Sequence, residues 1–146
     1  MDVQDIMTTD LVTATREESL QAAVSRMLDH RVGSVIVVDG SEPVGIVTET
    51  DVLAVGTTYE RPFAEIPVTR AMSGNPVTIA PDTSLESAID TLHDHGIKKL
   101  PVVSDGELVG VVTMTDFVYQ QHDLVGEVEK LERERQRALE GVDVEE

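Results

Sequence analysis

The sequence predicts an α+β fold in which two copies of a β-α-β-β-α unit are related by a pseudo-twofold axis and pack their sheets and helices around a shared core. Three observations carry this prediction. Residues 7–53 align without a gap onto residues 72–118, at a constant offset of 65, and 17 of the 47 pairs are identical. Each copy holds an amphipathic helical stretch and two β-branched runs joined by a turn. Each copy also closes on the pattern Gly-x-x-Thr-x-x-Asp.

The first elements of copy one follow from its residue pattern. Residues 3–9 predict a lead-in with one helical turn, and residues 11–14 predict an extended piece. Residues 15–18 have the spacing of a capping box, which opens a helix. Apolar residues recur at helical intervals over residues 20–28, and the cations within residues 29–31 suit a helix carboxyl end.

Two strands and a second helix complete the copy. The β-branched run at residues 34–38 ends in an Asp-Gly turn, and residues 44–48 form the returning strand. The second helix is expected to begin at Thr50 or Asp51. Residues 56–69 contain a glycine and two prolines and are the expected linker.

The second copy repeats these elements at the same offset. An extended piece, a helix opened by a second capping box, two strands and a closing helix are expected at residues 76–79, 83–92, 98–103, 108–114 and from 116 onward. The charged residues 127–140 favour a helical tail, either solvated or in contact with a second subunit. The predicted organisation is a first repeat with the start of the linker (1–60), a second repeat (61–122) and the tail (123–146).

Composition limits the possible classes of protein. The chain carries 28 acidic and 11 basic residues, a net charge of −17, whereas a nucleic-acid surface needs a basic face. It has no cysteine, so disulfides and cysteine-based metal sites or nucleophiles are excluded. No apolar run suits a membrane span and no signal peptide is visible, so a soluble, cytoplasmic protein is expected. The acid excess and scarce lysine favour a halophile's protein, since high salt screens self-repulsion, over the alternative of an ordinary acidic bacterial or archaeal protein.

The tandem copies, the order of elements and the repeated closing motif resemble the cystathionine-β-synthase (CBS) domain family, in which two such domains form a Bateman module. Residues 100–103 (Leu-Pro-Val-Val) also match the family's second strand, whereas the first copy has Ile36 in place of the proline. The resemblance covers nearly all of residues 1–122. It implies a regulatory, energy-sensing module that binds AMP, ADP or ATP, or else S-adenosylmethionine or NAD. It also implies a homodimer that controls an unidentified partner protein.

The repeated Thr and Asp have chemistry that suits an adenosine ligand. A carboxylate accepts two hydrogen bonds from vicinal ribose hydroxyls, and charged acceptors make stronger bonds. A threonine hydroxyl three residues earlier donates to a ribose or phosphate oxygen, and the amino end of the following helix favours phosphate. Small and β-branched side chains leave a slot for a flat adenine.

Carried over by position, the resemblance implies two clefts between the copies. The first cleft would combine Thr48 and Asp51 with Met72, Val77, Ile97, Lys98 and Lys99. The second cleft would combine Thr113 and Asp116 with Met7, Val12, Val32 and Gly33. Because only the first set contains lysines, the Asp51 cleft is predicted to be the better site for a nucleotide phosphate.

Simpler roles for the same residues stay open at this stage. Asp51 and Asp116 are also good helix N-caps. The threonines suit any strand, the lysines suit a strand edge, and the valines, with Ile97, suit any core. His93 and His95 resemble metal ligands, but consecutive helical positions point in different directions and no full ligand set is visible, so helix capping is the preferred role.

Three classes of function follow from these observations. The preferred class is a non-catalytic regulatory module with an adenosine ligand and no required cofactor. The alternative is a ligand-free scaffold that acts through dimerisation and its acidic helical tail. No nucleophile with a base, no paired catalytic acids and no Walker-type glycine loop are visible, so an enzyme is not expected.

Overall fold

The structure is a computed structural model that describes residues 1–120, 133–135 and 137. The predicted tail at residues 123–146, with its expected helix at 127–140, therefore lies almost wholly outside the described residues. Among the described residues, every helix is too short or too polar to traverse a lipid bilayer.

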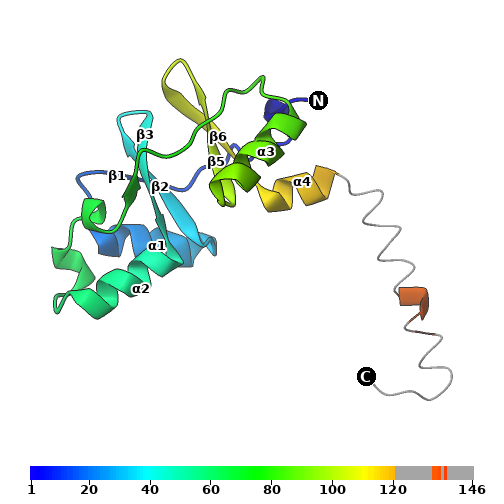
Figure 1. Ribbon diagram of the computed structural model, residues 1–146. Helices are drawn as coiled ribbons and strands as arrows, with labels where there is room; N and C mark the ends of the chain where they lie inside the picture. The colour runs from blue at the N-terminus through cyan, green and yellow to red at the C-terminus, as the bar shows by residue number, and fades with distance from the viewer. Residues whose placement is uncertain (121–132, 136, 138–146) are drawn as a thin grey trace.

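The predicted order of elements in the first repeat is confirmed (Figure 1). After a 3₁₀ turn, η1 (Val3–Asp5), come β1 (Thr13–Thr15), α1 (Leu20–His30), β2 (Ser34–Asp39), β3 (Glu42–Thr48) and α2 (Glu49–Thr58). Strand β1 runs parallel to β2, and β2 and β3 form an antiparallel hairpin. The sheet has the order β1-β2-β3-β4, so its last strand comes from beyond the linker.

The second repeat follows two short linker turns. The elements are η2 (Phe63–Glu65), η3 (Val68–Arg70), β4 (Ser73–Gly74), α3 (Leu85–His95), β5 (Lys99–Ser104), β6 (Glu107–Thr113) and α4 (Met114–Gln120). Strands β5 and β6 form the second antiparallel hairpin, and β4 pairs with β3 of the first repeat. The α+β fold of two similar repeats is therefore confirmed.

The extended piece expected at residues 76–79 makes one parallel β-bridge, through Ile79, in place of a strand. The cause lies in the neighbouring strand. In the first repeat the Ile36 N–H donates to the Val12 carbonyl at 3.3 Å. The equivalent residue is Pro101, which has no N–H to donate. The missing N–H of Pro101 therefore shortens the second sheet.

Helices α1 and α3 begin later than the capping residues expected from the sequence, Thr15 and Thr83. Ser19 and Ser84 are the N-caps, and each hydroxyl accepts a hydrogen bond from the N–H three residues further on, at 3.2 Å and 3.1 Å. Both serines have an extended backbone. The expected starts were wrong because a serine in this conformation is among the strongest N-caps; Ser19 directly follows the first expected box, and Ser84 is the second residue of the other.

Helix α2 is longer than expected at both ends. It begins at Glu49, because Thr48 is its N-cap, and it continues through Gly56 to Thr58. The rest of the expected linker packs closely against the first repeat, and Ile66 and Val68 are buried there. The linker is therefore part of the folded module.

The shared core consists of two clusters, and each cluster uses residues from both halves of the sequence. Ile66, Val68 and Ala71 of the linker pack with the first repeat. Val3, near the amino terminus, is fully buried with the second repeat, and its N–H donates to the Thr83 carbonyl at 2.9 Å. Each repeat thus buries its apolar surface only with a segment that precedes the other repeat.

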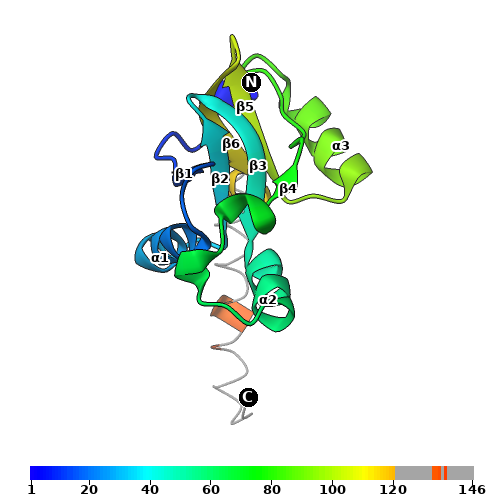
Figure 2. The ribbon, with the colours of Figure 1, turned by 90° about the vertical axis from the view of Figure 1, so that its left-hand side faces the viewer.

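The two repeats meet through their sheets, with the helices outside. Figures 1 and 2 show β2, β3, β5 and β6 together in the middle of the molecule, with α1 and α2 on one side and α3 on the other. Strand β3 contacts β6, and the Leu108 N–H donates to the Ser41 carbonyl at 2.8 Å. Strands β3 and β6, which lead into the two Thr-x-x-Asp motifs, therefore meet at the interface between the repeats.

Candidate functional site

Thr48 and Asp51 form a reciprocal capping box at the start of α2. The Thr48 N–H and hydroxyl both donate to Asp51 Oδ2, at 2.9 Å and 3.0 Å. The Asp51 N–H contacts Thr48 Oγ1 at 3.3 Å. Helix capping is thus one real role of these residues, as the simpler interpretation held. It uses one carboxylate oxygen and leaves Oδ1 outside the box.

Thr113 and Asp116 repeat this arrangement at the start of α4. The Thr113 N–H donates to Asp116 Oδ2 at 2.8 Å, and the Asp116 N–H contacts Thr113 Oγ1 at 3.3 Å. The hydroxyl of Thr8, from the amino-terminal segment, contacts the other oxygen, Oδ1, at 3.4 Å. Asp116 Oδ1 is therefore an acceptor of the kind that a ribose hydroxyl needs, and a hydroxyl group, that of Thr8, already lies beside it.

The two lysines lie beside the closing motif of the second repeat. Lys99 lies opposite Thr113 in the antiparallel ladder of β5 and β6, and the Met114 N–H donates to the Lys98 carbonyl at 3.3 Å. Burial lowers the pKa of Lys99, while the nearby charge of Asp116 raises it in opposition. Lys99 is therefore close to Asp116, whereas the sequence analysis grouped both lysines with Asp51, and the assignment of the better phosphate site to the Asp51 cleft stays a prediction.

The equivalent positions of the first repeat lie beside Asp51. Ser34, the counterpart of Lys99, pairs with Thr48, and the Glu49 N–H donates to the carbonyl of Gly33 at 3.1 Å. Ser34 is buried. Gly33 therefore lies beside the start of α2, and its expected place in the Asp116 cleft stays a prediction.

Met72 and Met7 pack across the glycines of the two closing motifs. Met72 packs across the backbone of Gly45 on β3, and Met7 packs across Gly110 on β6. A Cβ atom at either glycine would come within 2.5 Å of the methionine sulfur. The glycine of each closing motif is therefore needed because another segment of chain crosses it closely.

The remaining candidates sort by repeat, not across repeats. Val12 packs against the first core cluster, and Val77 and Ile97 pack against the second. Val32 and Gly33 line a groove between α1 and α2. The expected place of these apolar residues in clefts between the two copies stays a prediction.

An open groove of about 480 Å³ lies between α1 and α2 on the outer face of the first repeat. Its walls are mainly apolar, and Leu28 and Leu53 on its rim are 73% and 70% exposed. Arg31 and Glu49 add one charge of each sign. Sequence analysis placed these leucines on helices but gave them no surface role.

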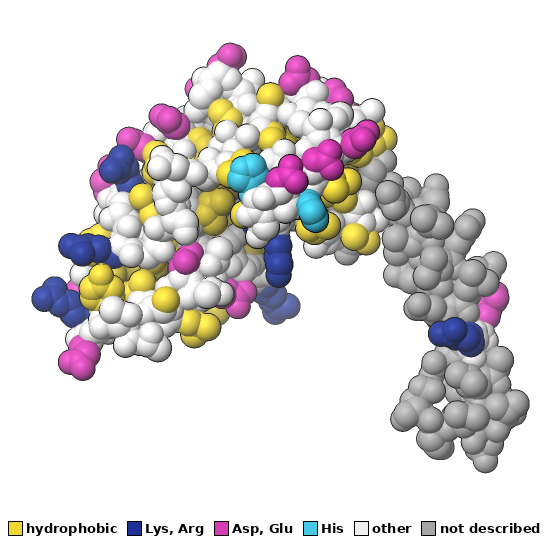
Figure 3. Space-filling model, viewed as in Figure 1, with side chains coloured by type: hydrophobic (Ala, Val, Ile, Leu, Met, Phe, Trp, Pro, Cys, Tyr) yellow, Lys and Arg dark blue, Asp and Glu magenta, His cyan; other side chains and the backbone are white. Residues whose placement is uncertain are grey.

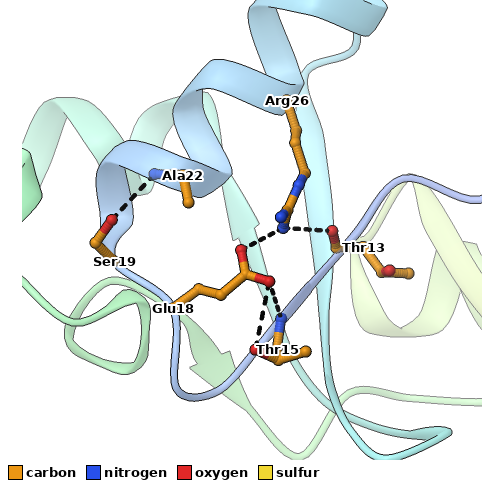
Figure 4. Close-up of polar contacts among 6 residues, drawn as sticks. All are labelled: Thr13, Thr15, Glu18, Ser19, Ala22 and Arg26. Carbon is orange, nitrogen blue, oxygen red and sulfur yellow. Dashed lines mark hydrogen bonds and ion pairs between the residues drawn. The ribbon is translucent and has the colours of Figure 1, made fainter.

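Sequence analysis also missed a polar cluster between β1 and α1, shown in Figure 4. Arg26 Nη1 lies 2.5 Å from Glu18 Oε2 and also donates to the Thr13 carbonyl at 3.0 Å. Glu18 Oε2 is buried, and its contact with Arg26 is an ion pair without hydrogen-bond alignment. The guanidinium of Arg26 lowers the pKa of Glu18. The second repeat has threonines at the positions equivalent to Glu18 and Arg26, and this difference between the repeats was the one sign of the cluster in the sequence.

His30 and His95 contact backbone carbonyls of their own helices. His30 Nδ1 lies 3.0 Å from the Arg26 carbonyl, and His95 Nδ1 lies 3.0 Å from the Thr91 carbonyl, at matching helix ends. His93 contacts only the carboxylate of its neighbour Asp94, at 3.7 Å, in an exposed position. Within the described part of the chain, no cluster of three or more potential ligands is positioned to hold a metal ion.

Comparison with known proteins identifies the family. A model of the CBS domain matches residues 3–56 and 65–123, which are the two repeats. This protein belongs to the CBS domain family. The CBS domain pair is generally a regulatory module, and the resemblance inferred from the closing motifs is thereby confirmed.

Several CBS relatives cover most of the chain. The CBS domain-containing protein YhcV of Bacillus subtilis is 35% identical over 119 residues, which are 82% of this chain and 84% of YhcV. The solved structure of AcuB from Vibrio cholerae has a TM-score of 0.77 at 30% identity and covers 89% of this chain and 96% of AcuB.

Two solved relatives contain adenosine ligands. CBSX2 in complex with AMP has a TM-score of 0.72 at 27% identity and covers 84% of this chain and 97% of CBSX2. The CBS pair of MJ0100, in complex with 5′-methylthioadenosine and S-adenosylmethionine, has a TM-score of 0.73. At 23% identity over 84% of this chain and 97% of MJ0100, it supports the fold alone.

Proposed function

We propose that this CBS pair is a non-catalytic regulatory module that binds an adenosine-containing ligand beside the Thr-x-x-Asp motifs. The observation that carries the proposal is the matched pair of carboxylates, Asp51 and Asp116, each fixed by its own threonine. Each keeps one oxygen, Oδ1, outside its capping box, and a charged acceptor suits ribose hydroxyls. The complex of CBSX2 with AMP supports AMP, ADP or ATP as the first candidates.

Thermal unfolding with and without ligand tests this function. AMP, ADP, ATP, NAD and S-adenosylmethionine are added separately to the full-length protein at constant salt. A ligand that binds only the folded state stabilises it by about 2.7 kcal/mol at a hundredfold excess over its Kd. That corresponds to a rise of several degrees in Tm. If no ligand in this panel raises Tm of folded, nucleotide-free protein, the scaffold function is favoured instead.

The module signals through another copy or another protein. The exposed Leu28 and Leu53 border an apolar groove on α1 and α2, and Ile89 and Val118 are partly exposed on α3 and α4 of the second repeat. Exposed apolar surface on both pairs of helices suits a second copy of the chain. A homodimer through the helices, with ligand bound in the clefts, would transmit the ligand state to an unidentified partner.

The acidic surface is adapted to concentrated salt. Glu86, Asp90 and Asp94 are exposed on α3 at intervals of four residues, and Figure 3 shows acidic side chains in a row on this face. Like charges at this spacing destabilise a helix in dilute solution. Because the Debye length falls to about 3 Å at 1 M salt, the repulsion is largely screened there. A gain in Tm as KCl is raised into the molar range supports this adaptation.

A further inference from the structure

The groove between α1 and α2 carries one charge of each sign next to two exposed leucines. Arg31 and Glu49 line this groove, and so do Leu28 and Leu53, which are 73% and 70% exposed. Arg31 follows Leu28 by three residues, and Glu49 precedes Leu53 by four. Each charge is therefore about one helical turn from a leucine, and the groove offers an apolar pair of side chains beside a charged pair.

Arg31 and Glu49 lie at the same end of the groove. Arg31 is the C-cap of α1, and Glu49 is the first residue of α2. The Glu49 N–H donates to the Gly33 carbonyl at 3.1 Å, so the start of α2 is held close to the chain that leaves α1. Both charged side chains are exposed, and within the described part of the chain neither makes an ion pair. Both charges are therefore available to a second molecule.

The backbone of Arg31 gives a separate indication that its side chain is used. Arg31 adopts the left-handed conformation, with a φ of 54°. The equivalent residue of the second repeat is Gly96, with a φ of 61°. Glycine adopts this conformation without strain, whereas arginine does not. Because the helix end alone favours glycine, the strained arginine points to a contact made by its side chain.

We infer that the first repeats of two copies face each other across a twofold axis, with Arg31 of each copy paired with Glu49 of the other. A twofold interface brings the same surface of both copies together, so this contact occurs twice. Each pair matches two opposite charges beside the leucines that the interface buries. The inference rests on the homodimer of the proposed function. It adds which repeats meet and which residues select that arrangement.

The second repeat does not offer the same pair of charges. The residues equivalent to Arg31 and Glu49 are Gly96 and Met114. If the first repeat of one copy faced the second repeat of the other, Arg31 would meet a methionine and Glu49 a glycine. The second repeat adds a cation, Lys98, but has no carboxylate at the position of Glu49. Charge complementarity therefore favours the arrangement of first repeat on first repeat.

Charge reversal, measured by light scattering after gel filtration at one fixed salt concentration, tests the pairing. Arg31→Glu and Glu49→Arg each place like charges opposite each other in the twofold dimer. Each variant alone is expected to have a dimer Kd raised by about tenfold or more. An equimolar mixture of the two variants is expected to form a dimer with one chain of each, because both pairs then combine opposite charges. Retention of the untagged variant by the tagged one checks that composition.

Glu60→Arg and Arg61→Glu are the matched controls, since they make the same changes in charge at exposed positions outside the groove. Each control is expected to keep the dimer Kd within about threefold, because exposed charges at a distance are screened. Arg31→Gly separates the contact from the fold. It removes the charge and gives the helix end its favoured residue, so the dimer weakens while the urea midpoint of the monomer does not fall.

Each other outcome contradicts a defined statement. If the wild type is monomeric at high concentration, the homodimer and this inference both fail. If the charge-reversed variants remain dimers, or become monomers that do not combine on mixing, the pairing fails. A lower urea midpoint for monomeric Arg31→Gly would show that Arg31 serves its own helix. The Tm shift with AMP is measured on the same proteins, so failure of adenosine binding is seen separately from failure of this interface.

Discussion

Lys99 lies directly across the β5–β6 ladder from Thr113, and this register places a partly buried ammonium group near the carboxylate of Asp116. Burial disfavours the charged amine and lowers its pKa, and Asp116 offsets only part of that effect. The side chain therefore reduces stability in the unliganded protein and favours a bound anion.

Replacing Lys99 with methionine is therefore expected to stabilise the unliganded protein, by roughly 1 kcal/mol at neutral pH. Urea unfolding measures the difference, and Lys98→Met, at an exposed neighbouring position, is the matched control. Because the folded-state pKa of Lys99 lies below the ordinary lysine value of 10.5, the penalty is present at neutral pH and disappears as pH rises toward 10.5. A less stable Lys99→Met protein would contradict this account.

Glu18→Gln is expected to lower the free energy of unfolding by about 1–2 kcal/mol at pH 7, since Arg26 loses its charged partner. The lowered pKa of Glu18 means that its contribution is complete above the ordinary glutamate value of 4.5 and is lost as pH falls through the folded-state pKa. Denaturant unfolding from pH 7 to 3.5 should show the two proteins converging in acid. The neighbouring exposed Glu17→Gln serves as control, and an equal effect there would contradict the role of the ion pair.

Gly110→Ala is expected to destabilise the protein by about 1–3 kcal/mol, because the new methyl group overlaps the Met7 side chain and the Thr8 carbonyl. Gly45→Ala makes the same change against Met72 in the other repeat. Gly74→Ala is the control, since nothing lies within 4 Å of a Cβ atom there. Thermal melts rank the three variants. Equal melting temperatures would contradict the close packing of Met7 on Gly110 and of Met72 on Gly45.

Ser19→Ala and Ser84→Ala each remove a helix N-cap and are expected to cost about 1 kcal/mol. Thr15→Ala, at the first position of the capping box expected from the sequence, should cost clearly less. Its hydroxyl makes only a 3.4 Å contact with Glu18 and caps no helix. Chemical denaturation distinguishes the two possible helix starts directly.

Leu53→Asp is expected to convert a homodimer to monomer, because a charge replaces an apolar side chain that is 70% exposed on α2. Light scattering after gel filtration reports the mass. The exposed Ala54→Asp, the next residue on the same helix, points away from its neighbour and is the matched control. A wild-type protein that is monomeric at high concentration would rule out this interface.

The pattern of the sequence was sufficient for the order of elements, the repeat and the Thr–Asp pairs, because these depend on local periodicity and a constant offset. The position of Lys99 within the second hairpin could also be predicted from strand geometry. Antiparallel strands joined by a tight turn set the first residue of one opposite the last residue of the other, so Lys99 had to meet Thr113.

Other features depended on tertiary contacts. The Glu18–Arg26 pair joins residues whose partnership appears only when α1 lies over β1. The roles of Gly45 and Gly110 likewise depend on methionines that come from distant segments. Local pattern carries no information about such crossings.

The two CBS units exchange segments: the segment around Val3 completes the core of the second repeat, and the segment around Val68 completes the core of the first. A gene fragment cut between the copies would encode two halves that each carry the other's missing piece. Neither half then folds with a complete core, and unfolding of either unit releases a segment of its neighbour. The described module should melt in a single cooperative transition, and ligand bound at one cleft should slow proteolysis of both repeats.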